Sequence, residues 1–470
     1  MQGFTPANVD TLAPLRARLD ARAFPQTTDA YLTEPRGRHR GTGTVVAPPD
    51  TAGVAETLAF CHAHRIAVIP FGGGTGLVGG QLATGAPLIL SLERLTAVRD
   101  RHPSENVLVV EAGAILADVQ AEAEAMDRLF PLSLASEGSA RIGGLLATNA
   151  GGVNVLRYGT ARAQCLGLEV VQADGTVWNG LTRLRKDNTG YDLRDLFIGS
   201  EGTLGVITAA ALRLVPRPGG FGAAMLAVPS PAAALDLLAL AQDQVGEGVS
   251  AFEIIHRQGF DFLRQTGLEH RRPFADLPEW VVLIDLGLSG GADPQSALET
   301  LFETAFEREL VTDGVLAQSL GDRQAFWDAR ETIPEANRRI GAIASHDISL
   351  PLSAIPRFVE TAPDRLARIA EVRINCFGHL GDGNLHYNVF PAEGRERSDY
   401  DGVKAAITAS IHDLVHQMDG SISAEHGIGR LKVADLETYA GPAKLQMMRA
   451  LKTALDPQGI LNPGAILRSD

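Results

Sequence analysis

A glycine-rich run that directly follows an apolar stretch constrains this chain more than any other feature. Residues 66–71 (IAVIPF) have the pattern of a buried strand, and GGGTGLVGG follows at residues 72–80. So much glycine is costly unless the backbone needs positive φ angles or must approach something bulky. Successive N–H groups in such a loop form a concavity that binds anions, and a diphosphate suits it. The run therefore predicts a backbone loop that holds a phosphate-bearing ligand.

Two common phosphate-binding motifs do not fit this run. No Lys-Ser or Lys-Thr pair follows the glycines, which excludes a Walker motif. No helical pattern opens directly after them, and the acidic residue of a dinucleotide fingerprint is missing, since Glu93 is too near and lies in SLERL. Two further glycine-rich tracts occur at residues 137–152 and 199–205. Each tract alone is compatible with tight turns, but three in one presumed domain favour a large, extended cofactor.

Composition narrows the class of protein. A chain of 470 residues is longer than the chains that fold around a single hydrophobic core, so two or three domains are expected. The net charge of −14 argues against non-specific binding to nucleic acid or anionic membranes. No apolar run is long enough to span a membrane, no secretory signal is visible, and the three scattered cysteines form no disulfide or zinc–thiolate pattern. We therefore expect a cytoplasmic protein.

Helix and strand patterns divide the chain near two prolines. In the first part, CLGLEVVQADGTVW predicts a hairpin that turns at Asp174 and Gly175. The boundary is expected at Pro216–Gly220. Beyond it, AAMLAVP, WVVLIDLGL, HDISLPL and EVRINCFGHL predict strands, and helical patterns cover residues 232–245, 259–266, 294–309, 322–340, 399–418 and 442–455.

The glycine tracts carry a family resemblance. VIPFGGGTGLVGG, ATNAGGVNVLRYGTAR and DLFIGSEGTLGVIT resemble the FAD-binding domain of the vanillyl-alcohol-oxidase (PCMH-type) flavoproteins. The resemblance implies that the first loop holds the FAD pyrophosphate and that the other two line the isoalloxazine and adenosine. No histidine or cysteine lies within 70–80 or 136–160, so the FAD is expected to be non-covalent. The implied contacts are Gly72, Gly73, Gly74, Thr75, Gly76, Leu77, Ser136, Gly138, Gly143, Gly144, Thr148, Asn149, Gly152 and Ile207.

A second constellation contains histidines and a carboxylate. FGHLGDGNLHYN places His379 and His386 around a Gly-Asp-Gly turn, where two strands could bring both imidazoles to the same end of a hairpin. SAEHGIG adds Glu425 and His426. Two imidazoles and one carboxylate make an open metal site, and imidazole and carboxylate suit zinc, manganese and iron alike. Each residue alone is also compatible with a hydrogen-bonding role beside a turn.

These two motifs resemble the D-2-hydroxyglutarate and D-lactate dehydrogenase branch of FAD-linked oxidases, over residues 40 to 467. The resemblance implies that His379, His386 and Glu425 hold a divalent metal, with zinc as the first choice and manganese or iron as alternatives. It also implies that His426 is the general base and that both His426 and Asn388 contact the substrate. It also brings Asn462, in LNPGAI, back to the flavin.

Arg330 is the candidate group for binding a substrate carboxylate, because its planar fork forms two parallel charge-assisted bonds. The alternative is a solvated helix charge paired with Glu331 or Glu335. The resemblance favours carboxylate binding, but it weakens at two nearby positions. Pro334 stands where the 2-hydroxyglutarate enzymes carry a threonine, and Ser345 where they carry a lysine. A monocarboxylate such as D-lactate is therefore as well supported as a dicarboxylate.

Together these patterns predict an α+β fold in four parts. A leader (1–37) precedes a two-subdomain PCMH-type FAD-binding domain (38–217). A substrate or cap domain built on an antiparallel sheet (218–418) follows, and then a C-terminal helical segment that returns to the flavin (419–470).

The expected function is FAD-dependent, metal-assisted oxidation of a D-2-hydroxy acid to the 2-oxo acid, with hydride transfer to flavin N5. No NAD fingerprint is evident, so an electron-transfer flavoprotein or a quinone is the expected acceptor, and a homodimer is the oligomer considered. The sequence leaves two alternatives open. One is a metal-dependent hydrolase of a nucleotide-like substrate, and the other is a non-enzymatic flavin or metal carrier.

Overall fold

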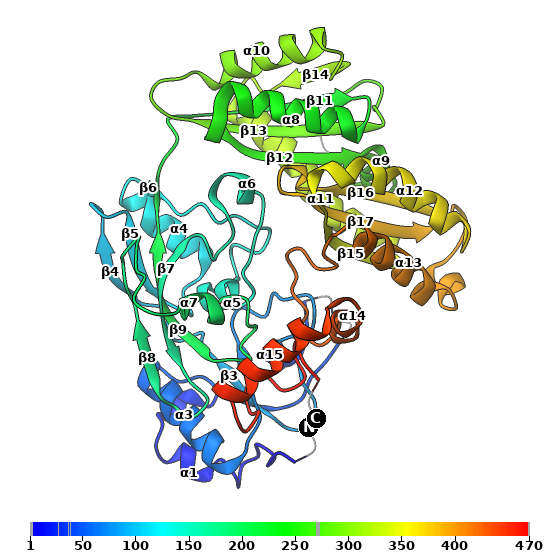
Figure 1. Cartoon of the computed structure of the whole chain (residues 1–470). Helices are drawn as coiled ribbons and strands as arrows, with labels where there is room; N and C mark the ends of the chain where they lie inside the picture. Colours follow the sequence, from blue (N-terminus) through cyan, green and yellow to red (C-terminus); the bar gives the residue numbers. More distant parts are fainter. Residues whose placement is uncertain (1–2, 27, 36, 38, 269–272, 469–470) are drawn as a thin grey trace. The chain divides into compact units, whose positions relative to one another are not determined.

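A computed structural model describes residues 3–26, 28–35, 37, 39–268 and 273–468 (Figure 1). Residues 1, 2, 27 and 36 of the predicted leader, and residue 38 at the predicted start of the FAD domain, lie outside the described part. The chain forms two compact units. Unit 1 comprises residues 1–152, 159–216 and 425–470, and unit 2 comprises 153–158 and 217–424.

Unit 1 contains two main sheets. A three-stranded parallel sheet has the order β1 (Thr44–Val46), β3 (Leu88–Ser91), β2 (Val68–Phe71). A five-stranded antiparallel sheet has the order β4 (Val98–His102), β5 (Val107–Glu111), β9 (Val206–Arg213), β7 (Cys165–Val171), β8 (Val177–Gly180). The short strands β6 (Arg128–Leu129) and β10 (Val215–Pro216) form a separate antiparallel pair.

Local sequence explains several elements of unit 1. The predicted hairpin is confirmed, because β7 and β8 pair across Asp174 and Gly175, and Gly175 adopts φ +89°. Asp50 caps α3 (Thr51–His64) by accepting a hydrogen bond from the backbone N–H of Gly53 at 2.8 Å. The other helices of the unit are α1 (Ala13–Arg16), α2 (Asp29–Leu32), α4 (Leu116–Ala125), α5 (Ile142–Ala147), α7 (Arg194–Phe197), α14 (Val433–Tyr439) and α15 (Pro442–Leu455).

Unit 2 is built on a seven-stranded antiparallel sheet, as predicted for the substrate domain. Its strand order is β14 (Asp313–Leu316), β11 (Gly220–Val228), β13 (Trp280–Leu288), β12 (Val249–His256), β16 (Val372–Gly378), β17 (Asn384–Pro391), β15 (Ala344–Ser349). Strand β12, which contains AFEIIH, was not among the predicted strands, because a glutamate interrupts its apolar run.

Helices cover both faces of this sheet. On one face, α9 (Arg257–Gln265) and α11 (Leu320–Ile340) pack against alternate residues of the central strands. The row α10 (Pro294–Glu307), α8 (Pro231–Val245), α12 (Ile355–Ala367) and α13 (Lys404–Gln417) packs on the sheet from the other side. The helix predicted over 399–418 begins later, at Lys404, because a separate 3-10 turn occupies Arg397–Tyr400. A short helix, α6 (Val155–Tyr158), contacts β12.

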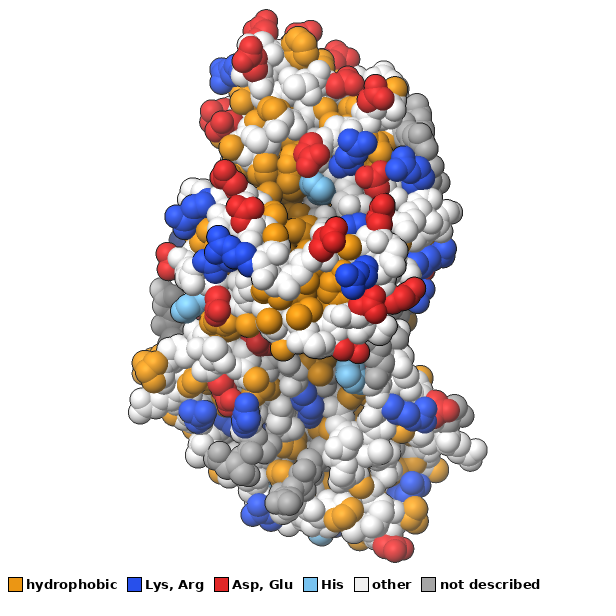
Figure 2. All heavy atoms as spheres, turned by 90° about the vertical axis from the view of Figure 1, so that its right-hand side faces the viewer, with side chains coloured by type: hydrophobic (Ala, Val, Ile, Leu, Met, Phe, Trp, Pro, Cys, Tyr) orange, Lys and Arg blue, Asp and Glu red, His pale blue; other side chains and the backbone are white. Residues whose placement is uncertain are grey.

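The surface carries charges of both signs. Figure 2 shows acidic and basic side chains interspersed with apolar ones over the visible face. Within the described residues, none of the helices is long and apolar enough to cross a membrane.

Candidate flavin and substrate sites

Unit 1 contains a cavity with a volume of about 140 Å³ that opens to solvent. All three glycine-rich tracts contribute to its lining, although they are far apart in the sequence. The predicted cofactor contacts that line it are Gly72, Gly73, Gly74, Thr75, Gly76, Gly143, Gly144, Thr148, Ile207 and Asn462. Leu77, Ser136, Gly138, Asn149 and Gly152 do not belong to the lining.

Glycine is required where the first loop meets the second tract. A Cβ on Gly73 would lie 2.2 Å from the carbonyl oxygen of Ser139, and Gly74 adopts φ +71°. A Cβ on Gly72 would lie 3.3 Å from Cα of Gly144, so the two backbones approach closely there. This backbone-walled cradle fits the FAD that the glycine pattern predicts.

The C-terminal segment of unit 1 is hydrogen-bonded to the first loop. Arg430 donates to the carbonyl oxygens of Gly80 at 2.7 Å and Gly79 at 3.1 Å, and to Oδ1 of Asn462 at 2.7 Å. Glu201, in the third tract, accepts from the backbone N–H groups of Ile428 and Gly429, both at 2.7 Å. Burial raises the pKa of Glu201, and these hydrogen bonds oppose that rise. Sequence reasoning assigned no role to Arg430 or Glu201, although both lie in or beside glycine motifs.

Glu425 and His426 lie at the start of this C-terminal segment. The Oε1 atom of Glu425 accepts a hydrogen bond from the backbone N–H of Gly152 at 2.9 Å. His426 lines the same cavity as the glycine loops. The structure therefore places the predicted base at the wall of the predicted flavin cavity.

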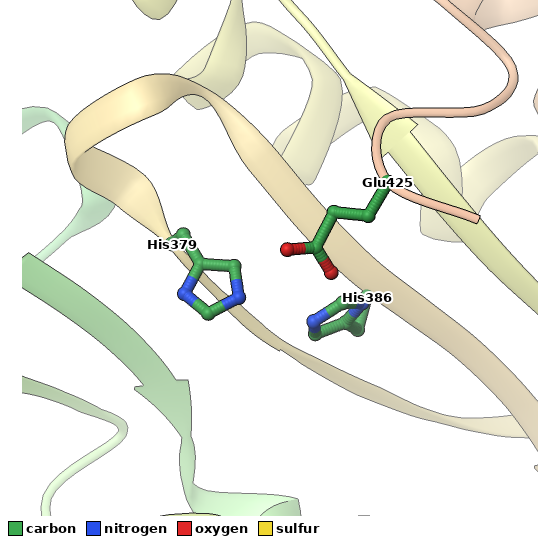
Figure 3. A group of neighbouring side chains, drawn as sticks. All are labelled: His379, His386 and Glu425. Carbon is green, nitrogen blue, oxygen red and sulfur yellow. The ribbon is translucent and has the colours of Figure 1, made fainter. Parts of the chain in front are cut away.

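In unit 2, the β16–β17 hairpin carries the two predicted metal-binding histidines. The rings of His379 and His386 are 5.5 Å apart between centroids and nearly perpendicular (Figure 3). The turn requires glycine directly before His379 and directly after Asp382. A Cβ on Gly378 would lie 2.5 Å from the carbonyl oxygen of Asn384, and Gly383 adopts φ +86°. The hairpin thus brings the imidazoles together as the spacing suggests.

The third predicted metal ligand, Glu425, follows directly on a residue anchored to this sheet. The backbone N–H of Ala424 donates to the carbonyl oxygen of Asp347 at 3.2 Å. Asp347, on β15, stands opposite His386 on β17 in the sheet register. Figure 3 draws Glu425 together with the two histidines. Ala424, the last residue of unit 2, is thus hydrogen-bonded to the strand that pairs with β17.

Arg330 is buried on α11, with 5% of its surface exposed. Its Nε donates to Oε2 of Glu253 at 2.6 Å, and its guanidinium lies 4.9 Å from the ring centroid of Phe377. The solvated-charge alternative is wrong, because Arg330 is buried and Glu335 pairs with Arg338 and Arg339 instead. Considering the described residues only, Nη2 of Arg330 is buried and makes no hydrogen bond.

Glu253 is the main residue that sequence reasoning missed. It is fully buried on β12, and its other oxygen, Oε1, forms a short hydrogen bond with Nδ1 of His379. Burial raises the pKa of Glu253, but the charges of Arg330 and His379 and their hydrogen bonds outweigh it and hold the pKa well below its ordinary value. The available signal was an acidic residue inside the apolar run VSAFEIIH.

The remaining predicted substrate contact, Asn388, lies on β17. Its side-chain amide donates to the backbone carbonyl of His386 at 3.1 Å, and Ser345 stands opposite it on β15. Pro334 lies inside α11, so it has no N–H to donate to the carbonyl oxygen of Arg330, four residues earlier.

Comparisons with known proteins identify the family of this chain. Residues 43–180 match the FAD binding domain family, and residues 221–466 match the C-terminal domain of FAD linked oxidases. The chain is 40% identical to the mitochondrial D-2-hydroxyglutarate dehydrogenase of Bos taurus, over 99% of this chain and 84% of the relative. It is 35% identical to the D-2-hydroxyglutarate dehydrogenase of Xanthomonas citri pv. viticola, over 90% of this chain and 89% of the relative.

A putative mitochondrial D-lactate dehydrogenase of Schizosaccharomyces pombe is 33% identical, over 95% of this chain and 86% of the relative. Among solved structures, p-cresol methylhydroxylase with substrate bound is similar, with a TM-score of 0.73 at 15% identity. That likeness covers 98% of this chain and 97% of the other, and it shows a shared fold. The chain therefore belongs to the FAD-linked oxidase family, with an FAD-binding domain followed by the family's C-terminal domain.

Proposed function

We propose that this protein oxidises a D-2-hydroxy acid to the corresponding 2-oxo acid, with FAD as the immediate electron acceptor. One observation carries the proposal. Beside the hairpin of His379 and His386, Arg330 has a buried Nη2 without a hydrogen bond among the described residues, while Glu253 occupies its Nε. A substrate carboxylate is the natural acceptor for such a buried donor, because an unsatisfied buried donor is costly.

The relatives support this substrate class. Two of those named above are called D-2-hydroxyglutarate dehydrogenases and one a putative D-lactate dehydrogenase. The names of these relatives thus favour a dicarboxylate substrate. Two side chains do not, because Ser345, opposite Asn388 on β15, carries no positive charge and Pro334, on α11, carries no hydroxyl group. We keep both D-2-hydroxyglutarate and D-lactate as candidates and propose the measurement below to separate them.

The residues have distinct proposed roles. Arg330 binds the substrate carboxylate, and Asn388 lies on the same sheet as a further contact. His379, His386 and Glu425 would hold a divalent cation, zinc, manganese or iron, since two imidazoles and a carboxylate suit each of them. When bound, such a cation supplies Lewis-acid stabilisation of an alkoxide at the substrate C2 oxygen.

His426 is the proposed base that removes the hydroxyl proton, a task suited to imidazole near neutral pH. The position of His426 in the lining of the cavity, beside the glycine loops, supports this role. FAD, when bound, supplies N5 as the acceptor of the C2 hydride. The glycine loops form part of the wall of that cavity, and their backbones pack closely there.

Several properties complete the proposal. We infer non-covalent FAD, because the cavity lining contains no cysteine and its one histidine is the proposed base. An electron-transfer flavoprotein or a quinone is the proposed reoxidant, a homodimer the proposed oligomer, and the cytoplasm the proposed compartment. The relatives from cattle and fission yeast are named mitochondrial, so cell fractionation is the measurement that decides the compartment.

An anaerobic panel of hydroxy acids tests the function. Purified, yellow holoprotein is mixed with D- and L-forms of 2-hydroxyglutarate, lactate and malate, with and without a chelator. We expect at least one D-acid to bleach the flavin absorbance, the matching L-acid to leave it unchanged, and prior chelation to slow the bleaching. A flavoprotein that no hydroxy acid reduces would contradict the proposal, and a colourless folded protein would favour the metal-dependent hydrolase.

A further inference from the structure

Glu253 contacts two functional candidates at once. Its Oε2 accepts from Nε of Arg330 at 2.6 Å, and its Oε1 is hydrogen-bonded to Nδ1 of His379. Its side chain has 0% exposure, and that of Arg330 has 6%. One buried carboxylate therefore bridges the proposed substrate-binding arginine and a proposed metal ligand.

The sheet explains how this bridge arises. Ile254 pairs with Gly378 and Ile255 with Phe377, so Glu253 lies next to the last pair on β12, and His379 follows it where the chain leaves β16. Ala251, Glu253 and Ile255 alternate with their neighbours and point to the face covered by α11, which carries Arg330. Strand β12 is the central strand of the sheet, so Glu253 lies between two paired strands.

The bridge determines which atoms each partner can offer. An acceptor at Nδ1 of His379 keeps the proton on that nitrogen, which leaves Nε2 as the nitrogen with a lone pair for a metal. The bond from Nε to Glu253 holds the guanidinium in place, while its buried Nη2 makes no hydrogen bond among the described residues. Both partners are donors, so only a side chain with two acceptor oxygens satisfies them together.

We propose that Glu253 is a positioning residue that acts on two partners at once. It sets the metal-binding tautomer of His379 and the carboxylate-binding orientation of Arg330. This inference rests on the proposed function and extends it to a residue that touches neither substrate nor metal. It predicts that metal affinity and substrate affinity are lost together when Glu253 is changed. A merely structural role would lower thermal stability and leave both affinities in place.

Unit 2 offers a matched control for the structural role. Asp285, on the neighbouring strand β13, is 1% exposed and forms an ion pair with Arg323 at 2.7 Å. Arg323 lies on α11, as Arg330 does, and Trp327 of the same helix donates to Asp285 at 2.8 Å. Replacing Asp285 therefore removes a buried acid from an ion pair with an arginine of the same helix, and it does not touch the histidines.

The experiment compares E253Q and D285N with the wild-type holoenzyme. Zinc affinity is measured by competition with a chelator, without turnover, and KM and kcat are measured with the hydroxy acid that best bleaches the wild-type flavin. Glutamine offers one acceptor where two donors converge, so we expect zinc affinity about 10–100-fold lower in E253Q and a KM at least about 10-fold higher. In D285N both quantities should stay within about twofold, despite a comparable fall in Tm.

The outcomes are distinct. E253Q with zinc affinity and KM changed no more than in D285N overturns the inference and leaves the proposed function standing. A wild-type protein that neither binds zinc nor is reduced by any hydroxy acid overturns both. If E253Q does not fold, E253D, which keeps two acceptors on a shorter side chain, replaces it, and both losses are then expected to a smaller degree.

Discussion

Three successive residues, Ala424 to His426, have three different surroundings. Ala424 is hydrogen-bonded to Asp347 in unit 2, and the carboxylate of Glu425 accepts from Gly152 in unit 1. His426 then lines the cavity of the glycine loops. Because the backbone bends at all three residues, their side chains reach different surroundings, as the proposed roles of metal ligand and base require.

At this scale, we expect His426→Ala to remove the proposed base without removing the flavin. Turnover should fall by about 10²–10⁴-fold, the usual contribution of general base catalysis, while the absorption spectrum of bound FAD persists. Stopped-flow reduction of the flavin by the best D-hydroxy acid measures this. His416→Ala, at an exposed position on α13, is the control and should react at the wild-type rate. Unchanged flavin reduction in His426→Ala would exclude the base assignment.

Helix α5 shows how one element serves both the core and the cavity. A Cβ on Gly143 would lie 2.7 Å from Cβ of Ala112, so this glycine permits close packing within unit 1. A Cβ on Gly144 would lie 3.8 Å from Cα of Gly72, which is ordinary contact. Both residues line the cavity, but only Gly143 is required by the protein's own packing.

These neighbours should respond differently to alanine. We expect Gly143→Ala to lower the free energy of unfolding by about 1–3 kcal/mol, because overpacking exceeds the gain in helix propensity. Gly144→Ala should leave the apoprotein as stable or slightly more stable, yet weaken FAD binding by at least about tenfold, because the methyl group narrows the cavity. Thermal melts of the apoprotein and FAD titration followed by fluorescence measure the two effects. The reverse pattern would show that Gly143, rather than Gly144, faces the cofactor.

For the whole molecule, the C-terminal residues complete the core of unit 1. Ile460 and Leu461 are fully buried, and the backbone of Val68 on β2 bonds to Ile460 and Asn462, both at 2.8 Å. Asp456 holds this segment by accepting from the N–H groups of Ile460 and Leu461. The strand that leads into the first glycine loop therefore depends on residues nearly 400 positions later, at the other end of the chain.

Truncation after Leu455 should consequently damage unit 1 selectively. Loss of two buried aliphatic side chains removes about 4–10 kcal/mol, so we expect FAD to be lost from the purified protein and a thermal transition to fall by about 10 °C or more. The sheet of unit 2, formed by residues 220–391, should keep its circular-dichroism signal. A chain that ends at Arg468 is the control. Full FAD occupancy after truncation at Leu455 would contradict this dependence.

Helices and turns that are determined by residues close together in the sequence could be predicted from the sequence. Helix α15 has the predicted bounds, Pro442–Leu455, because proline opens it and its pattern is regular. The hairpin at Asp174 and Gly175 follows from turn chemistry alone. Strand β12 could not be found in the same way, since its central glutamate is acceptable in a buried strand only with two distant partners.

The sequence by itself predicted which groups could carry the chemistry: glycine loops for a diphosphate cofactor, two histidines and a carboxylate for a metal, and an arginine for a substrate carboxylate. Such predictions are possible because residue type and short spacing limit what a segment can bind. Only the tertiary structure decided the partners, since Glu253 meets Arg330 and His379 across 77 and 126 residues, and Arg430 reaches Gly80 across 350. Such contacts depend on strand register and on which face each side chain points to, and both are set by the packing of the whole sheet.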